Sequence, residues 1–410
     1  MRLKGIEFTM KRTSVVVWSG LFVFVLVVMP VLMIGCGGAS KSASTLSIKI
    51  IDVDGELKPN ILNSAIEQYK IAHAGLVVST TFEIVSSDIL SNVLTAGFAG
   101  CDVIITPSLL NSKFKGLSNV FYPVSSAELS IPPSLDNAYK SGSTGDQLWS
   151  APLLLDPFVI VARKSNLNDT YKPNSWLSLR SRALSMDYAQ PHLLIETGRS
   201  LGIADFVACQ QFAYGYKNSN FHDTPPDSEL SEDDQLAILG QSLSNMKRFL
   251  FESSDDRISS IPQIKDLGKF ISSESYFTIV RYSDYMNLDE LSRKRLFAFA
   301  IPHAAAPVAP CYVTAAGIPI QSGNPALAED FIKFLITQLD SISKEQNQLP
   351  ALLPADGKKG IGFYLRETAF VPRVGSVALS DKIVIDAING EITIRELNDL
   401  WDSGFCIPKK

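Results

Sequence analysis

Apolar residues beyond position 45 alternate between the period of a strand and the period of a helix. Leu46–Val53 (LSIKIIDV) alternates and is rich in Ile and Val, so it predicts a β-strand. Ile61–Ala72 has helical spacing, Val77–Val85 predicts a second strand, and Asp88 is placed to cap a second helix. Asp102–Ile105 (DVII) predicts a buried strand that stops at the following Thr-Pro. This βαβαβ order predicts an α/β fold with a parallel, doubly wound sheet.

The remainder of the chain extends the same pattern, with no internal repeat. Further strands are predicted at Leu153–Arg163, Tyr276–Arg281, Phe297–Ile301 and Val313–Ile320. An amphipathic helix is predicted at Pro325–Leu339. The region from Trp176 to about Arg295 is mostly helical in pattern. It contains an acidic segment, His222–Asp234, which lacks the EF-hand spacing and is interpreted as a solvated surface loop.

The chain begins with a basic end and a long apolar segment, Val15–Met33. A basic start, a hydrophobic middle and small residues at the cut are typical of a secretory signal. A single transmembrane helix is the alternative, since about 20 apolar residues can span a bilayer. Pro30, Gly35 and Cys36 at the far end favour the signal. Met10 is an alternative start to Met1.

The end of this segment, Met33–Cys36 (MIGC), resembles the bacterial lipobox. The resemblance implies that residues 1–35 are a lipoprotein signal peptide, removed before a diacylated Cys36. Fatty-acyl chains anchor a soluble domain to a membrane because each buried methylene contributes about 0.8 kcal/mol. Residues 36–45, rich in Gly and Ser, are expected to form a flexible tether behind the lipidated cysteine.

Charge and cysteine content narrow the class of protein. The 410-residue chain has a net charge of −5, and no basic stretch suggests nucleic-acid binding. The remaining cysteines are far apart in sequence, at positions 101, 209, 311 and 406, and form no CxxC motif. Buried thiols are therefore favoured, although export makes disulfides possible.

Motifs that carry catalytic or cofactor chemistry are missing from the sequence. It has no GxSxG, HExxH, Walker or GxGxxG motif. Its histidines occur singly, at His73, His192, His222 and His303, which does not favour a metal site. We therefore expect no cofactor, no metal and no enzymatic activity.

Several segments occur in an order that resembles a known family. After the lipobox and the first strand come DVI, PLLLDPFVIVARKSNL, KPNSWLSL, ESYFTIVRYSDYM, FAFAIP and AAGIPIQSGNPALAEDFIKFLIT. Together they resemble the extracellular solute-binding proteins of ABC transporters, the group that includes maltose-binding protein. The chain departs from that pattern at Ala304–Pro310, where a glycine-rich link is usual, and at Gln147–Ser150, where Tyr-Gly is expected.

The resemblance implies a two-lobed, type II periplasmic-binding-protein-like clamp, each lobe a mainly parallel doubly wound sheet. Hinge crossings are expected near Asp156, near Arg295–Phe297 and near Leu339. The implied boundaries are 46–155 plus 297–338 for lobe 1, and 156–296 plus 339–410 for lobe 2.

The family also implies the function. A monomeric lipoprotein of an ABC importer captures a small polar solute by hinge closure and delivers it to the permease subunits, and a sugar is favoured as the solute. The protein is then held at the cell membrane by its lipid anchor alone, on the periplasmic or extracellular side.

Ligands of open α/β sheets lie outside the carboxyl ends of strands, and this rule selects the same positions as the resemblance. The candidate ligand-binding residues are Asp54, Glu56, Thr106, Ser108, Trp149, Asp156, Thr197, Arg199, Tyr282 and Tyr285. Aromatic rings stack on apolar sugar faces while polar groups fix orientation.

Structural roles compete with several of these assignments. The alternative for Asp54 is that it stabilises a turn, and the alternative for Arg199 is a surface ion pair. Of Tyr282 and Tyr285, one is expected to have a core role. The role of Trp149 is left open between packing and ligand stacking.

Two other functions are compatible with the same fold. One is a surface lipoprotein that binds a protein partner, and the other is an enzyme, because a fold does not determine function. A solute retained through purification would favour the hypothesis of a transport protein. A contiguous apolar surface patch would favour the hypothesis of a protein-binding lipoprotein.

Overall fold

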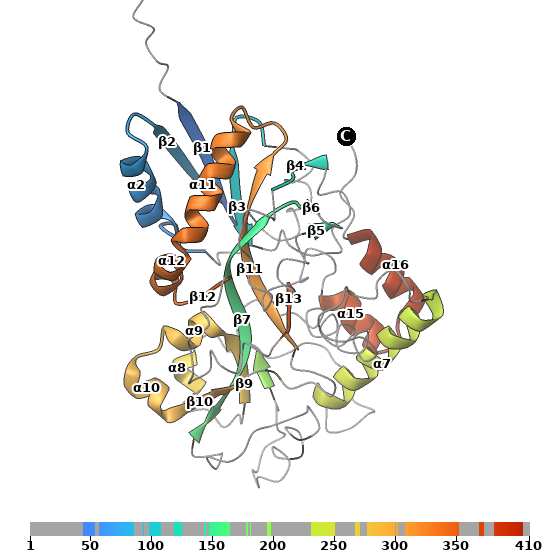
Figure 1. Ribbon diagram of the computed structural model, residues 1–410. Coiled ribbons are helices and arrows are strands. Elements are labelled where there is room, and N and C mark those ends of the chain that lie inside the picture. The colour runs from blue at the N-terminus through green and yellow to red at the C-terminus, as the bar shows by residue number, and fades with distance from the viewer. Residues whose placement is uncertain are drawn as a thin grey trace, which may run out of the picture. The chain divides into compact units, whose positions relative to one another are not determined.

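A computed structural model of the chain describes its regular elements and the turns that join them (Figure 1). It describes residues 44–53, 57–85, 93, 98–107, 119–124, 143–144, 147–164, 178, 181, 195–197, 231–250, 267–270, 277–299, 301, 308–351, 369–372 and 381–404. The strands are β1 Thr45–Val53, β2 Val77–Val85, β3 Val103–Pro107, β4 Phe121–Tyr122, β5 Ser143–Thr144, β6 Gln147–Leu148, β7 Ala151–Arg163, β8 Ile195–Thr197, β9 Phe277–Arg281, β10 Leu296–Phe299, β11 Val308–Pro319, β12 Leu349–Pro350 and β13 Ala369–Pro372. The helices are α2 Asn63–Ala72, α7 Glu232–Leu250, α8 Leu267–Phe270, α9 Tyr282–Met286, α10 Glu290–Arg295, α11 Pro325–Thr337, α12 Leu339–Gln346, α15 Asp381–Ile388 and α16 Ile394–Gly404.

The chain divides into two compact units, residues 1–45 with 75–77 and residues 46–74 with 78–410. In the first unit, the backbone N–H of Val77 donates to the carbonyl of Ser44 at 3.0 Å. The second unit contains the sheet and the candidate site described below. In the part of the chain that the structure describes, no helix combines the length and apolar character needed to cross a membrane.

Apart from β5 and β6, which form a separate two-stranded sheet, the described strands form one mixed sheet with two long central strands. Its order is β2-β1-β3-β11-β7-β9-β8, with β4 and β13 paired to β11, and β10 and β12 paired to β7. The long strands β7 and β11 run side by side and antiparallel (Figure 1). Every residue of β7 except the last is buried, as expected for a central strand.

Strand β7 changes its partners in the middle of its length. Residues 151–157 pair with β11, and residues 158–162 pair with β9. Strand β12 joins the first half of β7, and β10 joins the second half. The change falls at Pro157–Phe158, directly after Asp156, so one continuous strand serves both ends of the sheet.

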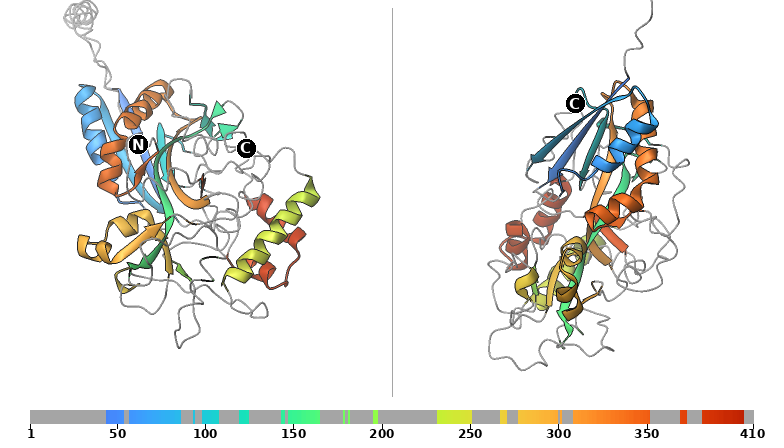
Figure 2. Two further views of the ribbon diagram at one scale, coloured as in Figure 1. Left: turned by 60° about the horizontal axis from the view of Figure 1, so that its bottom comes forward. Right: turned by 90° about the vertical axis from the view of Figure 1, so that its left-hand side faces the viewer.

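At one end of the sheet, α2 and α11 lie side by side on one face (Figures 1 and 2), and α11 contacts β11 and β7. Helix α11 buries Ala328, Phe331, Ile332 and Leu335, which lie on one face at the i, i+3, i+4, i+7 spacing. The buried ring of Tyr69 on α2 packs edge-on against the ring of Phe331, with 4.9 Å between the ring centroids. The Tyr69 hydroxyl donates a hydrogen bond to the Asp330 carboxylate at 2.7 Å. Apolar packing and one polar contact therefore join the two helices.

Most of the predicted elements of this region are confirmed. Strands β1, β2, β7 and β9 and helices α2 and α11 lie where the periodicity placed them. Parallel pairing is confirmed for β1 with β3 and for β8 with β9. The sheet as a whole is mixed, since all pairings of β7 are antiparallel. Of the predicted helix after Asp88, only Val93 lies within the described residues, and it is helical.

Three predicted boundaries were wrong. Strand β3 continues through Thr106 and Pro107, because the antiparallel neighbour β11 pairs with it as far as Pro107. Strand β11 begins at Val308, because β13 adds parallel pairing to its first residues. The end of the predicted acidic loop is helical, since α7 begins at Glu232 with three acidic residues in its first turn. Acidic side chains there favour a helix start.

Asp102 holds three segments at the start of β3. Its carboxylate accepts hydrogen bonds from the Ser47 N–H at 2.9 Å, the Ser322 hydroxyl at 2.8 Å and the Asn324 N–H at 3.2 Å. It thus ties the beginning of β1 to the residues that precede α11, and it is only 7% exposed.

We expect Asp102→Ala to lower the free energy of unfolding by about 2–4 kcal/mol, because hydrogen bonds to a charged group are lost and donors are left unpaired. Urea denaturation measures this. Asp340→Ala, an exposed residue on α12, is the control and should change stability by less than about 0.5 kcal/mol. Equal losses in the two variants would contradict the role assigned to Asp102.

Candidate functional site

The candidate site is centred on Asp156, where β7 changes partners. The side chain is 1% exposed. One carboxylate oxygen accepts the backbone N–H of Ser283 at 2.8 Å, and the other accepts the Ser283 hydroxyl at 2.5 Å. Gln348 Nε2 approaches the second oxygen at 3.5 Å. Asp156 therefore joins β7 to the first turn of α9 and to the residue before β12.

Burial determines the protonation chemistry of Asp156. Desolvation raises the pKa of its carboxyl from 3.8 to about 7, the hydrogen bonds from Ser283 and Gln348 oppose this rise, and the nearby Asp284 charge adds to it. A buried carboxylate is expected to be paired or strongly hydrogen-bonded, and here Ser283 supplies most of the donors. The carboxyl thus titrates close to neutral pH.

The short helix α9, whose Ser283 is bonded to this carboxylate, carries two tyrosines. Tyr282 directly precedes Ser283, and Tyr285 lies one turn further on; both are half-buried. Burial raises the pKa of both phenols, and the Asp156 charge adds to the rise at Tyr282. The tyrosines therefore stay protonated at neutral pH and can donate as well as accept hydrogen bonds.

A second charged pair supports the same turn. The Arg281 guanidinium donates to both oxygens of Asp284, with Nε–Oδ2 and Nη2–Oδ1 distances of 3.1 Å. It also lies over the ring of Tyr312, 5.7 Å from the centroid. Tyr312 is the β11 residue opposite Asp156. An ion pair, a cation–π contact and a buried carboxylate thus fix α9 against the central strands.

The connection between α12 and β12 contacts both the end of α9 and the Asp156 carboxylate. Asn347 adopts a left-handed backbone conformation, with φ 56°, at the end of α12. Its Nδ2 donates to Oδ1 of Asn287 at 2.7 Å. Gln348 follows and reaches Asp156, and Leu349 pairs with Leu155 of β7. The connection is therefore anchored both to the end of α9 and to β7.

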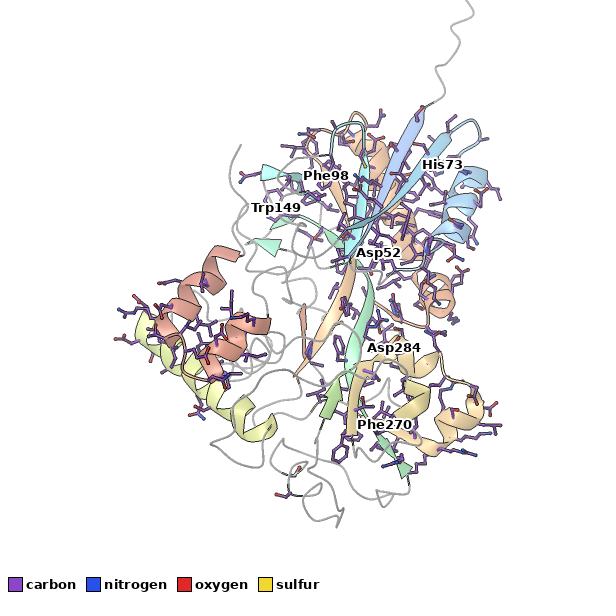
Figure 3. The ribbon with its side chains drawn as sticks, turned by 180° about the vertical axis from the view of Figure 1, so that it is seen from behind. Asp52, His73, Phe98, Trp149, Phe270 and Asp284 are labelled. Atoms are coloured by element: carbon purple, nitrogen blue, oxygen red, sulfur yellow. The ribbon has the colours of Figure 1, made fainter. Side chains whose placement is uncertain are left out.

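Of the predicted ligand-binding residues, Asp156 and Tyr282 lie close together here, and Tyr285 lies on the same short helix as Tyr282. Thr106 lies inside β3 with no exposed surface, so its predicted position in a turn was wrong. Trp149 lies between β6 and β7 and is 9% exposed, which is typical of a packing role (Figure 3). The predicted ligand contacts of these residues remain predictions.

Other predicted residues lie outside the described residues, wholly or in part. Asp54, Glu56, Ser108, Arg199 and Cys36 are among those that the structure does not describe. Thr197 is described only through its backbone, which pairs with Ile279. Near Asp54 in the sequence, the buried Asp52 accepts the N–H of Leu57 at 2.9 Å (Figure 3 labels Asp52), so this acid links the end of β1 to Leu57.

Ser283, Gln348 and Tyr312 were not predicted as site residues. Ser283 lies 127 positions from Asp156, and Gln348 lies 192 positions from it. No local pattern connects residues so far apart, so the sequence offered no signal for either. The Arg281–Asp284 pair had a signal, because opposite charges three residues apart lie close together on a helical turn.

Within the described part of the chain, no three His, Cys, Asp or Glu residues gather closely enough to hold a metal ion. Cys101 and Cys311 are buried free thiols, as the sequence favoured. Burial raises the pKa of Cys101 to about 11, and the pKa of Cys311 also rises, so neither thiol is activated. Cys209 and Cys406 lie outside the described residues.

No protein-family model and no curated protein sequence matches the chain. Its fold, in contrast, is similar to that of solved binding proteins. A Thermotoga lettingae ABC transporter solute-binding protein with α-D-tagatose is 15% identical, with a TM-score of 0.57 over 88% of this chain and 98% of that one. MalE3 of T. maritima with maltose is 15% identical, with a TM-score of 0.59 over 88% and 99% of the two chains. An ABC substrate-binding protein of Listeria monocytogenes with cycloalternan is 13% identical, with a TM-score of 0.58 over 88% and 98%.

The chain therefore has the fold of the solute-binding proteins of ABC transporters, which confirms the predicted α/β, type II fold class. Its structural neighbours are sugar-binding proteins and not enzymes. At 13–15% identity this similarity concerns the fold alone.

The raised pKa of Asp156 makes stability depend on pH. The unfolded chain releases this proton near pH 3.8 and the folded chain near pH 7. Between these values the folded state binds more protons, so the free energy of unfolding falls as pH rises through this window. We expect the wild type to lose about 2–3 kcal/mol relative to Asp156→Asn between pH 5 and pH 8, since one pKa unit corresponds to 1.36 kcal/mol.

Urea denaturation of both proteins at the two pH values measures this difference. Asp233→Asn, at an exposed position on α7, shows the general effect of removing a carboxylate. A constant difference between wild type and Asp156→Asn across the range would show that Asp156 is ionised in both states.

Proposed function

We propose that the protein is the substrate-binding lipoprotein of an ABC importer, which captures a small sugar by hinge closure and delivers it to the permease. The observation that carries this proposal is the junction at Asp156: a central strand changes partners there, beside two half-buried tyrosines, within a solute-binding-protein fold. The neighbours with bound tagatose, maltose and cycloalternan favour a sugar. The same neighbours, and the lack of catalytic motifs, support a binding protein without enzymatic activity.

The proposed lobes are 46–155 plus 297–338 and 156–296 plus 339–410. The partner change at Pro157–Phe158 supports the first crossing, since β7 pairs with different strands on its two sides. The start of β10 at Leu296 and the start of α12 at Leu339 coincide with the other two proposed crossings. Closure about such crossings is a common way in which two-lobed proteins enclose a ligand.

The proposed contacts combine aromatic and polar groups. Tyr282 and Tyr285 can stack on the apolar face of a sugar, and their protonated phenols can hydrogen-bond its hydroxyls. Asp156 contributes by fixing the turn that carries them. Asp54, Glu56, Thr106, Ser108, Trp149, Thr197 and Arg199 complete the proposed set on the sequence evidence. Such a mixture is usual for a small-molecule site.

The proposed anchor is the diacylated Cys36, which holds the mature protein at the membrane on its periplasmic or extracellular side. The basic, apolar and small-residue order of residues 1–35 supports this processing. No other membrane contact is proposed.

We expect Asp156→Ala to weaken sugar binding at least about tenfold. The substitution removes the acceptor of both Ser283 donors and releases the turn that carries Tyr282. An unpaired buried polar group costs about 1–3 kcal/mol, and 1.4 kcal/mol corresponds to one decade in Kd. The measurement is calorimetric titration with the sugar that mass spectrometry identifies after denaturing the native protein.

Asp233→Ala, at an exposed position on α7, is the control and should bind like the wild type. Circular dichroism confirms that each variant is folded. If Asp156→Ala binds as tightly as the wild type, this site assignment is wrong. If the native protein releases no sugar and binds none, the proposed function is wrong.

Cys36→Ser should leave an uncleaved, unlipidated precursor, because the thiol is both the lipid acceptor and the residue at the cut. Intact-mass spectrometry and detergent phase partitioning of the two proteins in their host test this. The lipid anchor would be refuted by a mutant that has the mature protein mass and partitions like the wild type.

A further inference from the structure

Gln348 carries a buried amide oxygen without a partner. Its Oε1 has neither solvent contact nor a hydrogen-bond donor. Ser150 Oγ is another buried side-chain atom of the described residues without a hydrogen bond. Buried side-chain acceptors nearly always have a donor, so an exception next to a candidate site calls for an explanation.

The Asp156 carboxylate determines which way the amide points. An ionised carboxylate only accepts hydrogen bonds, so the Nε2 donor of Gln348 faces it, at 3.5 Å. The reverse orientation would place two acceptor oxygens against each other. Oε1 is therefore directed away from Asp156 whenever that residue is ionised.

The backbone on both sides of Gln348 is held in place. Asn347 is bonded to Asn287, and Leu349 pairs with Leu155 of β7. Gln348 as a whole residue is partly exposed, although its Oε1 is covered. Through Asp156, the same amide is connected to Ser283, the residue after Tyr282. Gln348 is thus a preorganised acceptor beside the proposed sugar site.

We propose that Gln348 is a recognition residue of this site, whose Oε1 accepts a hydrogen bond from a hydroxyl of an uncharged saccharide while Nε2 stays on Asp156. The proposal rests on the proposed function and specifies its ligand class. A hydroxyl is the donor that a saccharide offers, whereas a carboxylate or phosphate group at that position would bring only acceptors and repel Oε1. The site then discriminates against acidic sugars.

The matched test is Gln348→Met, which keeps the length of the side chain and removes its polar atoms. If Oε1 is merely an unsatisfied buried atom, its removal leaves ligand affinity unchanged. If Oε1 receives a ligand hydroxyl, calorimetric titration with maltose should show affinity reduced about tenfold or more. The loss of the Nε2 contact with Asp156 should lower stability in urea whether or not Oε1 meets a ligand. Gln348→Asn, which withdraws the amide by one methylene, should show the same loss of affinity and serves if Gln348→Met does not fold.

A ligand series separates recognition from a structural role. The wild type should bind one monodeoxy analogue of maltose, which lacks the hydroxyl that donates to Oε1, more weakly than it binds maltose. Gln348→Met should bind that analogue and maltose with equal affinity. Glu345→Gln, at an exposed position on α12, is the control and should bind like the wild type. Equal binding of maltose by wild type and both Gln348 variants would overturn the assignment of Gln348 while leaving the proposed function intact. Failure of wild type to bind maltose, D-tagatose or any sugar released from the native protein would refute both.

Discussion

The hydrogen bonds between the buried Asp156 carboxylate and Ser283 are the interaction on which the arrangement of the site depends. A carboxylate removed from water is costly unless donors surround it, and here the donors come from another segment of the chain. Meeting that requirement fixes the first turn of α9 against β7. The two tyrosines of α9 and the loop before β12 then take their positions from the same carboxylate.

The long strands β7 and β11 explain why such a junction forms at this place. Each is buried and pairs with several strands in succession along its length. The partner of β7 changes directly after Asp156, and the Asp156 side chain accepts its hydrogen bonds from the start of α9. The ion pair of Arg281 with Asp284 and the contact of Arg281 with Tyr312 reinforce this point from the β9 and β11 sides.

Elsewhere in the fold, single buried polar side chains hold loops in the same way. Asp102 joins the start of β1 to the residues before α11, and Asp52 links the end of β1 to Leu57. Such contacts depend on a few atoms, whereas the apolar faces of the strands and helices tolerate many substitutions. This is consistent with a fold shared with solute-binding proteins at 13–15% identity.

The sequence by itself determined the elements whose signal is local. The alternation in β1, the helical spacing of α2 and α11 and the apolar run of β7 each require only one segment of chain, and each was predicted. Asp156, Tyr282 and Tyr285 were selected from the same local patterns together with the family resemblance. The tertiary structure decided what those residues contact. Thr106 lies within β3 because β11 pairs beside it, and Asp156 faces Ser283 and Gln348 because distant segments meet at β7. Hydrogen bonds between residues more than a hundred positions apart leave no periodic signal, so only the folded chain shows them.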